Sequence, residues 1–385
     1  MAATIIGAWV IGGAIVAIAH SAGLNVTWWQ AIHTLTLGAL TTAIVVFSTH
    51  FTEALTRAGA PDYESVAWRV GLIQLGLLLL LAGRPNGGDF GWLANNGAAL
   101  VAAAAIWHGA ALFGHLQRSQ TFSNPFSPTA WNFVAAACFL IVAVSLAVAA
   151  GNGWLPYDAT ISAHSRAAIW GFAWLTVLGA VITVLPTVTS TKASPAARTW
   201  CVRGLIAHSA GLAAAVVALA TGHPRIAGGF LLVVAIAAAV VMVPVLSGAF
   251  GAVASWTTPA LSVAAGTVWL VALCIADAAT LLLGGVAREV TADILPALVG
   301  GSLLQLVTGV LLYFLPTLRG GGPRVIQRAR ARADRFGFAR VAIMNGGALL
   351  SLVGTTSWHV AGTVILAVGL GLHVAALVYA VKPQD

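Results

Sequence analysis

The stretch AHSRAAIWGFAWLTVLGAVITVLPTV, residues 163–188, joins His164 to a long apolar run that ends in Leu-Pro-Thr. Gly179 precedes this Leu-Pro-Thr by six residues, and the same pattern recurs 130 residues later from Gly309. Two long apolar segments that share a glycine, a spacing and a proline predict two copies of one ancestral helix, each closed by its proline. In the second copy Ile294 stands where the first has His164. This difference indicates a chemical role for His164, and a polar residue at a helix mouth is the alternative.

Composition places the chain among membrane proteins. Of its 385 residues 59% are hydrophobic and only 7% are charged, and the mean hydropathy is +0.95. A soluble domain carries roughly a quarter charged residues, so this chain cannot cover a water-facing surface. A span needs about 20 mainly apolar residues, and twelve candidates are centred near residues 15, 42, 75, 106, 140, 176, 213, 237, 271, 306, 348 and 370. We therefore expect an all-α integral membrane protein with about twelve transmembrane helices, forming a single polytopic domain over residues 1–385.

Twelve helices divide into three groups of four, and we expect pseudo-repeats over about residues 1–120, 121–250 and 251–385. The two segments that share the Gly-x5-Leu-Pro-Thr pattern would be the second helices of the second and third groups. The expected second helix of the first group contains LTLGALTTAIVV, residues 35–46. It fits the pattern loosely, because it has Gly38 but no terminal proline.

The positive charge of the chain is concentrated in one connection. The formal net charge is +8, and seven arginines lie between the expected tenth and eleventh helices: Arg319, Arg324, Arg328, Arg330, Arg332, Arg335 and Arg340. Positive connections stay in the cytoplasm, so we expect a cell-membrane protein with both termini cytoplasmic. The same charges attract anionic lipid headgroups, although topology marking is the interpretation that we favour. The distribution indicates the lipid bilayer as partner rather than nucleic acid.

Histidines are the main candidates for chemistry, since the chain has ten of them against ten acidic residues. Ionisable side chains inside a span are costly and usually mark a functional path, and neutral imidazole binds haem iron and copper. Sorted by expected depth, an outer layer holds His33 and His164, and an inner layer holds His50, His115, His208 and His373, with His108 between them. The remaining three, His20, His223 and His359, are expected at helix mouths beside water, where a histidine is ordinary.

The sharpest prediction concerns a metal site shared by His33 and His164. Both lie within roughly two turns of the expected outer start of their helices, and related helices of successive groups face the same interior. We therefore expect the two imidazoles on neighbouring helices, at nearly equal depth and within reach of one cofactor. A second, inner site would place His50, or His108 and His115, opposite His373. Two such sites would form a route across the bilayer.

Asp277 is the one carboxylate deep inside an expected span. Two roles stay open for it, an element of a proton path and a plain structural hydrogen bond. Together with Gln305 and the histidines, Asp277 could also line the polar path of a transporter. The sequence has no phosphate-cradling glycine loop beside a basic residue and no Gly-x-Ser-x-Gly elbow, and its three cysteines show no pair spacing.

Three groups of four helices resemble the plan of the haem–copper oxidase catalytic subunit, and His164, Gly179 and Pro186 look like its second-helix pattern. The chain more closely resembles the membrane region of actinobacterial copper-oxidase or nitrite-reductase-like proteins, where runs similar to HTLTLGALTTAIVVFSTHF, from His33, recur. The related NnrS family shares the general scheme. The resemblance implies b-type haem, with copper as a further metal, held by intramembrane histidines. It also implies electron transfer or oxygen or nitrogen-oxide redox chemistry, as in a membrane oxidoreductase, with a redox partner protein or a quinol.

The sequence departs from the oxidase pattern in two helices. The adjacent His-His pair that binds copper in that superfamily is missing from the expected seventh helix, which has His208 alone, and the expected tenth helix has no histidine. These departures argue against a binuclear oxygen-reducing centre and leave haem binding as the leading hypothesis. The alternatives are a transporter or permease whose polar path includes Asp277, and a non-catalytic assembly or sensor subunit. The oligomeric state stays open.

Overall fold

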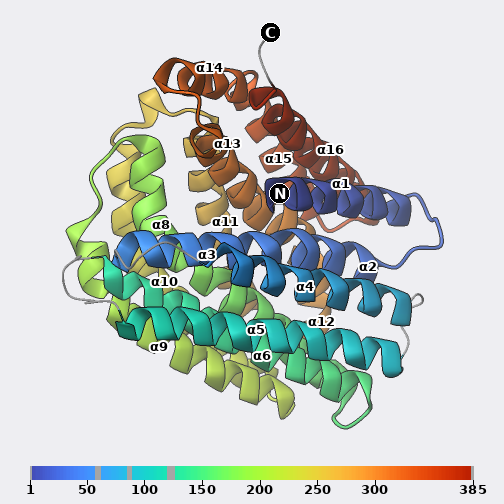
Figure 1. The fold of residues 1–385 in the computed structure, drawn as a ribbon. Coiled ribbons are helices and arrows are strands. Elements are labelled where there is room, and N and C mark those ends of the chain that lie inside the picture. The colour runs from blue at the N-terminus through green and yellow to red at the C-terminus, as the bar shows by residue number, and fades with distance from the viewer. Residues whose placement is uncertain (1, 57–61, 85–88, 119–125, 383–385) are drawn as a thin grey trace.

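The computed structural model describes residues 2–56, 62–84, 89–118 and 126–382, and within these ranges it contains helices and no strand (Figure 1). Eleven helices are long and apolar enough to cross a membrane. Eight of them lack an internal π-helical segment: α1 (Ala2–Ser21), α4 (Tyr63–Gly83), α5 (Trp92–Arg118), α6 (Trp131–Gly151, preceded by the short η2, Ser127–Ala130), α9 (Pro195–Ala220), α10 (Pro224–Phe250), α11 (Thr258–Leu282) and α16 (Thr356–Ala380). The chain is therefore an all-α, multi-pass membrane protein, as composition predicts.

Three further spans are composite, because a π-helical segment interrupts each of them after its first turns. They are α2 (Trp28–His33), η1 (Thr34–Leu40) and α3 (Thr41–Thr56); α7 (Tyr157–Arg166), η3 (Ala167–Ala173) and α8 (Trp174–Thr189); and α12 (Ala287–Pro296), η5 (Ala297–Leu304) and α13 (Gln305–Arg319). In these three spans 67–72% of the apolar window is buried, against 28–56% in the other eight. We call them the first, second and third inner helices, because they are the most buried spans.

The three π-helical segments occur at a regular spacing, beginning 133 and 130 residues apart. The fifth residue of each is a glycine: Gly38, Gly171 and Gly301. A Cβ atom at these glycines would come within 2.6 Å of Trp9, 2.5 Å of Phe139 and 2.6 Å of Ala348, respectively. Such distances are shorter than any ordinary carbon–carbon contact, so glycine permits a close approach of a neighbouring helix at the same place in each inner helix.

The twelve expected segments all correspond to helices, but one of them is short. All twelve centres fall inside helices of the structure. The eleventh, α15 (Gly337–Ser351), has only 15 residues, which is below the roughly 20 that a perpendicular span requires. Eleven spans are supported by length and composition, and the twelfth stays a prediction.

Two local predictions were wrong. Pro186 and Pro316 do not end their helices, which continue to Thr189 and Arg319. A proline removes one hydrogen bond without forbidding a further turn. The first of these helices ends where Ser190 adopts a left-handed conformation (φ 55°). The span that carries His164 begins at Tyr157, seven residues earlier, so this histidine lies about two turns inside the helix, as expected.

The arginine-rich connection is itself partly helical. It contains α14 (Pro323–Ala333), which packs on α13 and α16. Figure 1 shows α14 at one end of the bundle, near the C-terminus of the chain. Its alternating arginines and alanines are strong helix formers, and Pro323 stands at the first helical position, where its missing N–H is not needed.

Candidate functional site

The imidazoles of His33 and His164 lie side by side between the first and second inner helices. Their ring centroids are 6.5 Å apart and their planes differ by only 13°. His33 is the last residue of α2 and His164 lies in α7, so both precede the π-helical segments of their spans. The structure brings together the two residues that the sequence predicts to share a site. Within the described ranges no other two histidine rings contact each other.

Both imidazoles are oriented by backbone carbonyls. Nδ1 of His33 donates to the Trp29 carbonyl at 2.9 Å, and Nδ1 of His164 donates to the Ala143 carbonyl at 2.7 Å. A carbonyl oxygen can only accept, so both rings hold their proton on Nδ1 and present a lone pair on Nε2. Neither Nε2 has a hydrogen-bond partner among the described residues. This arrangement, in which a backbone oxygen fixes the tautomer and the other nitrogen stays free, is the usual support of a metal-binding histidine.

A large cavity opens beside the two rings. Its volume is about 550 Å³, within the range of roughly 300–1,000 Å³ that small-molecule and cofactor sites occupy. The wall is mainly apolar and comes from the first and second inner helices, from α4, α5 and α6, and from the start of the third inner helix. We call this space the histidine cavity.

Two arginines contribute positive charge to the wall of the histidine cavity. Arg84, at the end of α4, is 5% exposed, and its guanidinium lies over the rings of Trp29 (4.9 Å) and Phe90 (5.1 Å). Arg288, in α12, pairs with Asp158 at 2.6 Å. An apolar cavity with an arginine at two places on its wall suits a ligand that is mostly apolar and carries acidic groups.

Asp277 forms a buried ion pair that sequence reasoning did not identify. Its carboxylate accepts from Arg166 at 2.6 Å (Nη2 to Oδ1) and 3.1 Å (Nε to Oδ2), and from Nε1 of Trp170 at 2.8 Å. Arg166 and Asp277 are each about 1% exposed. The prediction that Asp277 is a buried, hydrogen-bonded carboxyl agrees with this geometry. The sequence feature that would have indicated this pair is Arg166, a charged residue next to an apolar run and opposite in sign to Asp277.

The guanidinium of Arg166 has further partners on the third inner helix. Its Nη1 donates to the Ala287 carbonyl at 2.8 Å and to Oγ1 of Thr291 at 2.5 Å. Thr291 also lines the histidine cavity, so the ion pair lies behind the cavity wall and joins α7, α11 and α12. The Asp277 carboxylate is held in place by Nη2 and Nε of Arg166 and by Nε1 of Trp170. This arrangement favours the structural alternative for Asp277 over a proton path.

His108 is not available as a ligand. Nη1 of Arg69 donates to its Nδ1 at 2.8 Å, and its Nε2 lies 2.9 Å from Oγ of Ser48. Because arginine can only donate, Nδ1 of His108 must accept and Nε2 must carry the proton. Both ring nitrogens are therefore engaged, and this histidine stabilises the contact between α3, α4 and α5.

The expected inner site is not assembled in the described part of the chain. Nε2 of His208 donates to the Trp170 carbonyl at 2.7 Å, and Nδ1 of His373 donates to the Gly369 carbonyl at 3.1 Å. His50 lies 3.9 Å from Glu53, and Nε2 of His115 is buried without a partner among these residues. No group of three or more His, Cys, Asp or Glu side chains is placed to hold a metal ion in the ranges described.

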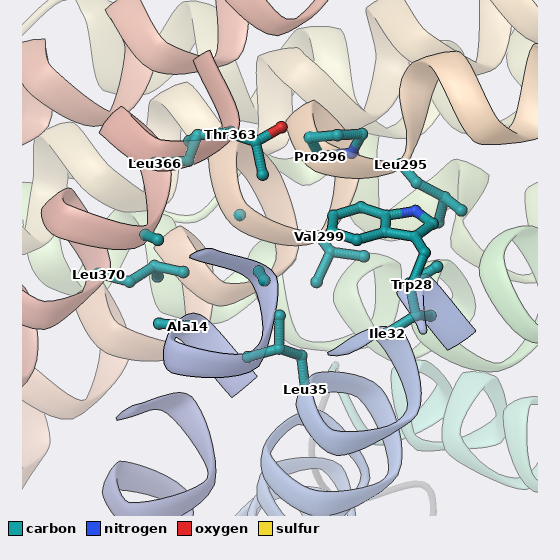
Figure 2. A pocket seen from close by; sticks show the side chains of 13 residues that line it. Ala14, Trp28, Ile32, Leu35, Leu295, Pro296, Val299, Thr363, Leu366 and Leu370 are labelled. Carbon is teal, nitrogen blue, oxygen red and sulfur yellow. The ribbon is translucent and has the colours of Figure 1, made fainter. Parts of the chain in front are cut away.

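The space between the first and third inner helices contrasts with the histidine cavity. It holds a pocket of only about 30 Å³, lined by apolar side chains and Thr363 from α1, α2, η1, α12, η5 and α16 (Figure 2). Figure 2 shows Trp28 and Ile32 on one side of this pocket and Leu366 and Leu370 on the other. We call it the apolar pocket. Trp28, Ile32, Leu295 and Val299 line both spaces and thus separate them.

Comparison with known proteins does not supply a function. No protein-family model matches the chain, and no curated protein matches it.

Proposed function

We propose that the histidine cavity binds one b-type haem, which His33 and His164 would hold, in a membrane protein of electron transfer or of oxygen or nitrogen-oxide redox chemistry. The observation that carries the proposal is the paired, preoriented imidazoles on the wall of a cofactor-sized cavity. Haem iron, when bound, would supply reversible one-electron transfer. The protein would supply the two ligands, their tautomers and an apolar surrounding.

The separation of the two rings supports a single shared metal ion. An imidazole nitrogen binds a metal at about 2.0–2.1 Å, so two imidazoles that hold one ion must lie close together. The centroids of His33 and His164 are 6.5 Å apart. Their Nδ1 bonds to backbone carbonyls leave Nε2 of both rings for the ion.

Cavity volume favours haem over a bare copper ion. Two imidazoles could also hold copper, and a bare ion would need only the gap between the rings. The cavity of about 550 Å³ extends well beyond that gap, and its mainly apolar wall suits a porphyrin face. Arg84 and Arg288, both on the cavity wall, are suited to the two acidic side chains that haem carries.

The repeat and the resemblance to haem–copper oxidases form a second part of the proposal. We infer that the three inner helices descend from one unit, because their π-helical segments and glycines recur at spacings of 133 and 130 residues. π-helical turns are rare overall, and those that do occur are often found at functional sites. The three groups of four helices would then follow the oxidase plan, with a single haem site between the first two groups. A redox partner protein or a quinol would exchange electrons with it.

The proposed topology places both termini and α14 in the cytoplasm of a cell-membrane protein, because the arginine-rich segment follows the third inner helix. A cysteine introduced into residues 319–340 should be modified only by reagents that cross the membrane. Modification from outside intact cells would reverse the assignment.

The position of Asp277 weakens the transporter alternative, whose polar path was expected to include this residue. Asp277 is bonded to Arg166 and Trp170 behind the cavity wall and is absent from the cavity lining. A spectrum separates haem binding from both a transporter and a non-catalytic subunit. Purified from cells supplied with haem, the protein should show a Soret band that shifts on reduction with dithionite. A colourless, metal-free protein from the same cells would refute haem binding.

A further inference from the structure

The segment around α14 carries an excess of positive charge. Residues 319–340 contain seven arginines and a single carboxylate, Asp334. Oδ1 of Asp334 accepts from the backbone N–H and the hydroxyl of Thr258, each at 2.5 Å. This carboxylate therefore holds the start of α11, and it is one negative charge against seven arginines.

Three of these arginines are held by aromatic rings. The guanidinium of Arg330 lies 4.4 Å from the Tyr313 ring, that of Arg332 lies 5.8 Å from Tyr379, and that of Arg335 lies 5.1 Å from Phe336. In the described part of the chain none of these three forms an ion pair. Ring contacts orient a guanidinium without neutralising it, so its N–H groups can still bind an anion.

A depression lies between α14 and α16. It is open to the surface, has a volume of about 470 Å³ and is lined by Ala331, Arg332, Asp334, Arg335 and Tyr379. Arg340 is buried at the same corner, 5% exposed, and donates to the Ala333 carbonyl at 2.5 Å. Its Nε and Nη1 have no partner among the described residues, so Arg340 adds to the positive potential here.

Exposed apolar side chains lie next to the arginines of this segment in the sequence. Phe336 and Phe338 are 71% and 78% exposed, and Leu318 is 60% exposed. Large apolar side chains next to arginines are typical of segments that lie in the membrane–water interface, where rings enter the acyl region and cations meet headgroups. A free phosphate ion would use the arginines but would leave these rings in water.

We propose that the depression between α14 and α16 binds the headgroup of an anionic phospholipid. Arg332 and Arg335 contact its phosphate, Tyr379 forms the floor beside Arg332, and Phe336 and Phe338 insert among the neighbouring acyl chains. This site is separate from the histidine cavity, and it does not depend on haem binding.

Native mass spectrometry tests the proposal, because it counts the lipids that a protein retains. The full-length protein is released from mixed phosphatidylglycerol and phosphatidylcholine. Wild-type protein should retain phosphatidylglycerol preferentially. Each basic side chain near a membrane surface contributes roughly fivefold in affinity, so Arg332→Gln/Arg335→Gln should lower this preference by roughly 30-fold. Lys192→Gln/Arg198→Gln removes two charges from another connection and should retain the preference.

Further variants make each result decisive. Arg332→Lys/Arg335→Lys keeps the charge and should keep most of the preference, which gives a reading even if the glutamine variant does not fold. Excess inorganic phosphate should leave the retained lipid in place. An equal loss in the Lys192/Arg198 control, no loss in the glutamine variant, or displacement by inorganic phosphate alone would each overturn the proposal.

Discussion

The histidine cavity and the apolar pocket both adjoin the first inner helix, but they differ in volume and in the polar groups of their walls. Both lie beside the first inner helix, one toward the second inner helix and one toward the third. The first measures about 550 Å³ and the second about 30 Å³. The same helical plan thus makes a cofactor-sized space on one side of Trp28 and Ile32 and a filled core on the other.

The inner helices also differ in residue identity at equivalent positions. Three residues before its π-helical segment, the second inner helix has His164 and the third has Ile294. One residue before these segments, the three inner helices have His33, Arg166 and Pro296. The same position thus holds a proposed ligand in the first inner helix, a member of a buried ion pair in the second and an apolar wall residue in the third. The backbone at this position is helical in all three. The backbone sets where chemistry can occur, and the side chains decide whether it does.

Filling the histidine cavity should have the largest effect on cofactor content. Ala168 lines the cavity, and Ala168→Trp should remove most of the bound haem without altering either histidine, because the added ring occupies the space that the cofactor needs. Haem per chain, measured from the absorption spectrum and the protein concentration, checks this. Ala213→Trp, on the exposed face of α9, is the control and should keep the haem.

Breaking the Arg166–Asp277 pair should have the largest effect on stability. Asp277→Asn leaves a buried, uncompensated guanidinium and should lower the free energy of unfolding by about 3–5 kcal/mol. Thermal unfolding in detergent measures the change. Arg166→Met/Asp277→Leu removes both charges and should be less destabilised than Asp277→Asn. An unchanged stability of Asp277→Asn would contradict the structural role assigned to the pair.

The sequence predicts more of the fold than of the site. Apolar runs give the positions of the helices, and the depth of His33 and His164 predicts their contact. The π-helical segments have no such signal, because only the spacing of Gly38, Gly171 and Gly301 hints at them. The sequence predicts His108 as a candidate ligand, but its ring is bonded to Arg69, which is 39 residues away in the sequence. Spacing alone does not reveal such side-chain pairs.

The glycines of the inner helices should tolerate substitution poorly. Gly171→Ala would place a Cβ 2.5 Å from Phe139 and should destabilise the protein by about 1–3 kcal/mol through overpacking. A Cβ added at Gly71 in α4 would have no heavy atom within 4 Å, so Gly71→Ala should be neutral or slightly stabilising. The two variants, compared by thermal unfolding, separate close packing from helix propensity. Equal stabilities would count against the close approach at Gly171.

A histidine added to the third inner helix should have the smallest effect. Ile294→His introduces the residue found at the equivalent position of the second inner helix, yet the apolar pocket beside the third inner helix, of about 30 Å³, cannot admit a cofactor. The variant should contain no more haem per chain than the wild type. A second haem in this variant would show that the histidine, and not the cavity, limits binding.

The most direct test of the shared site compares His33→Ala, His164→Ala and the double variant by haem and iron per chain. The wild type should contain one low-spin haem per chain. Each single variant should lose the same low-spin spectrum, by loss of haem or by a change of spin state, and the double variant should lose no further low-spin signal. His373→Ala, a buried histidine outside the cavity, should keep it. Two single variants that each removed a different half of the signal, with additive loss in the double, would contradict a site shared by His33 and His164.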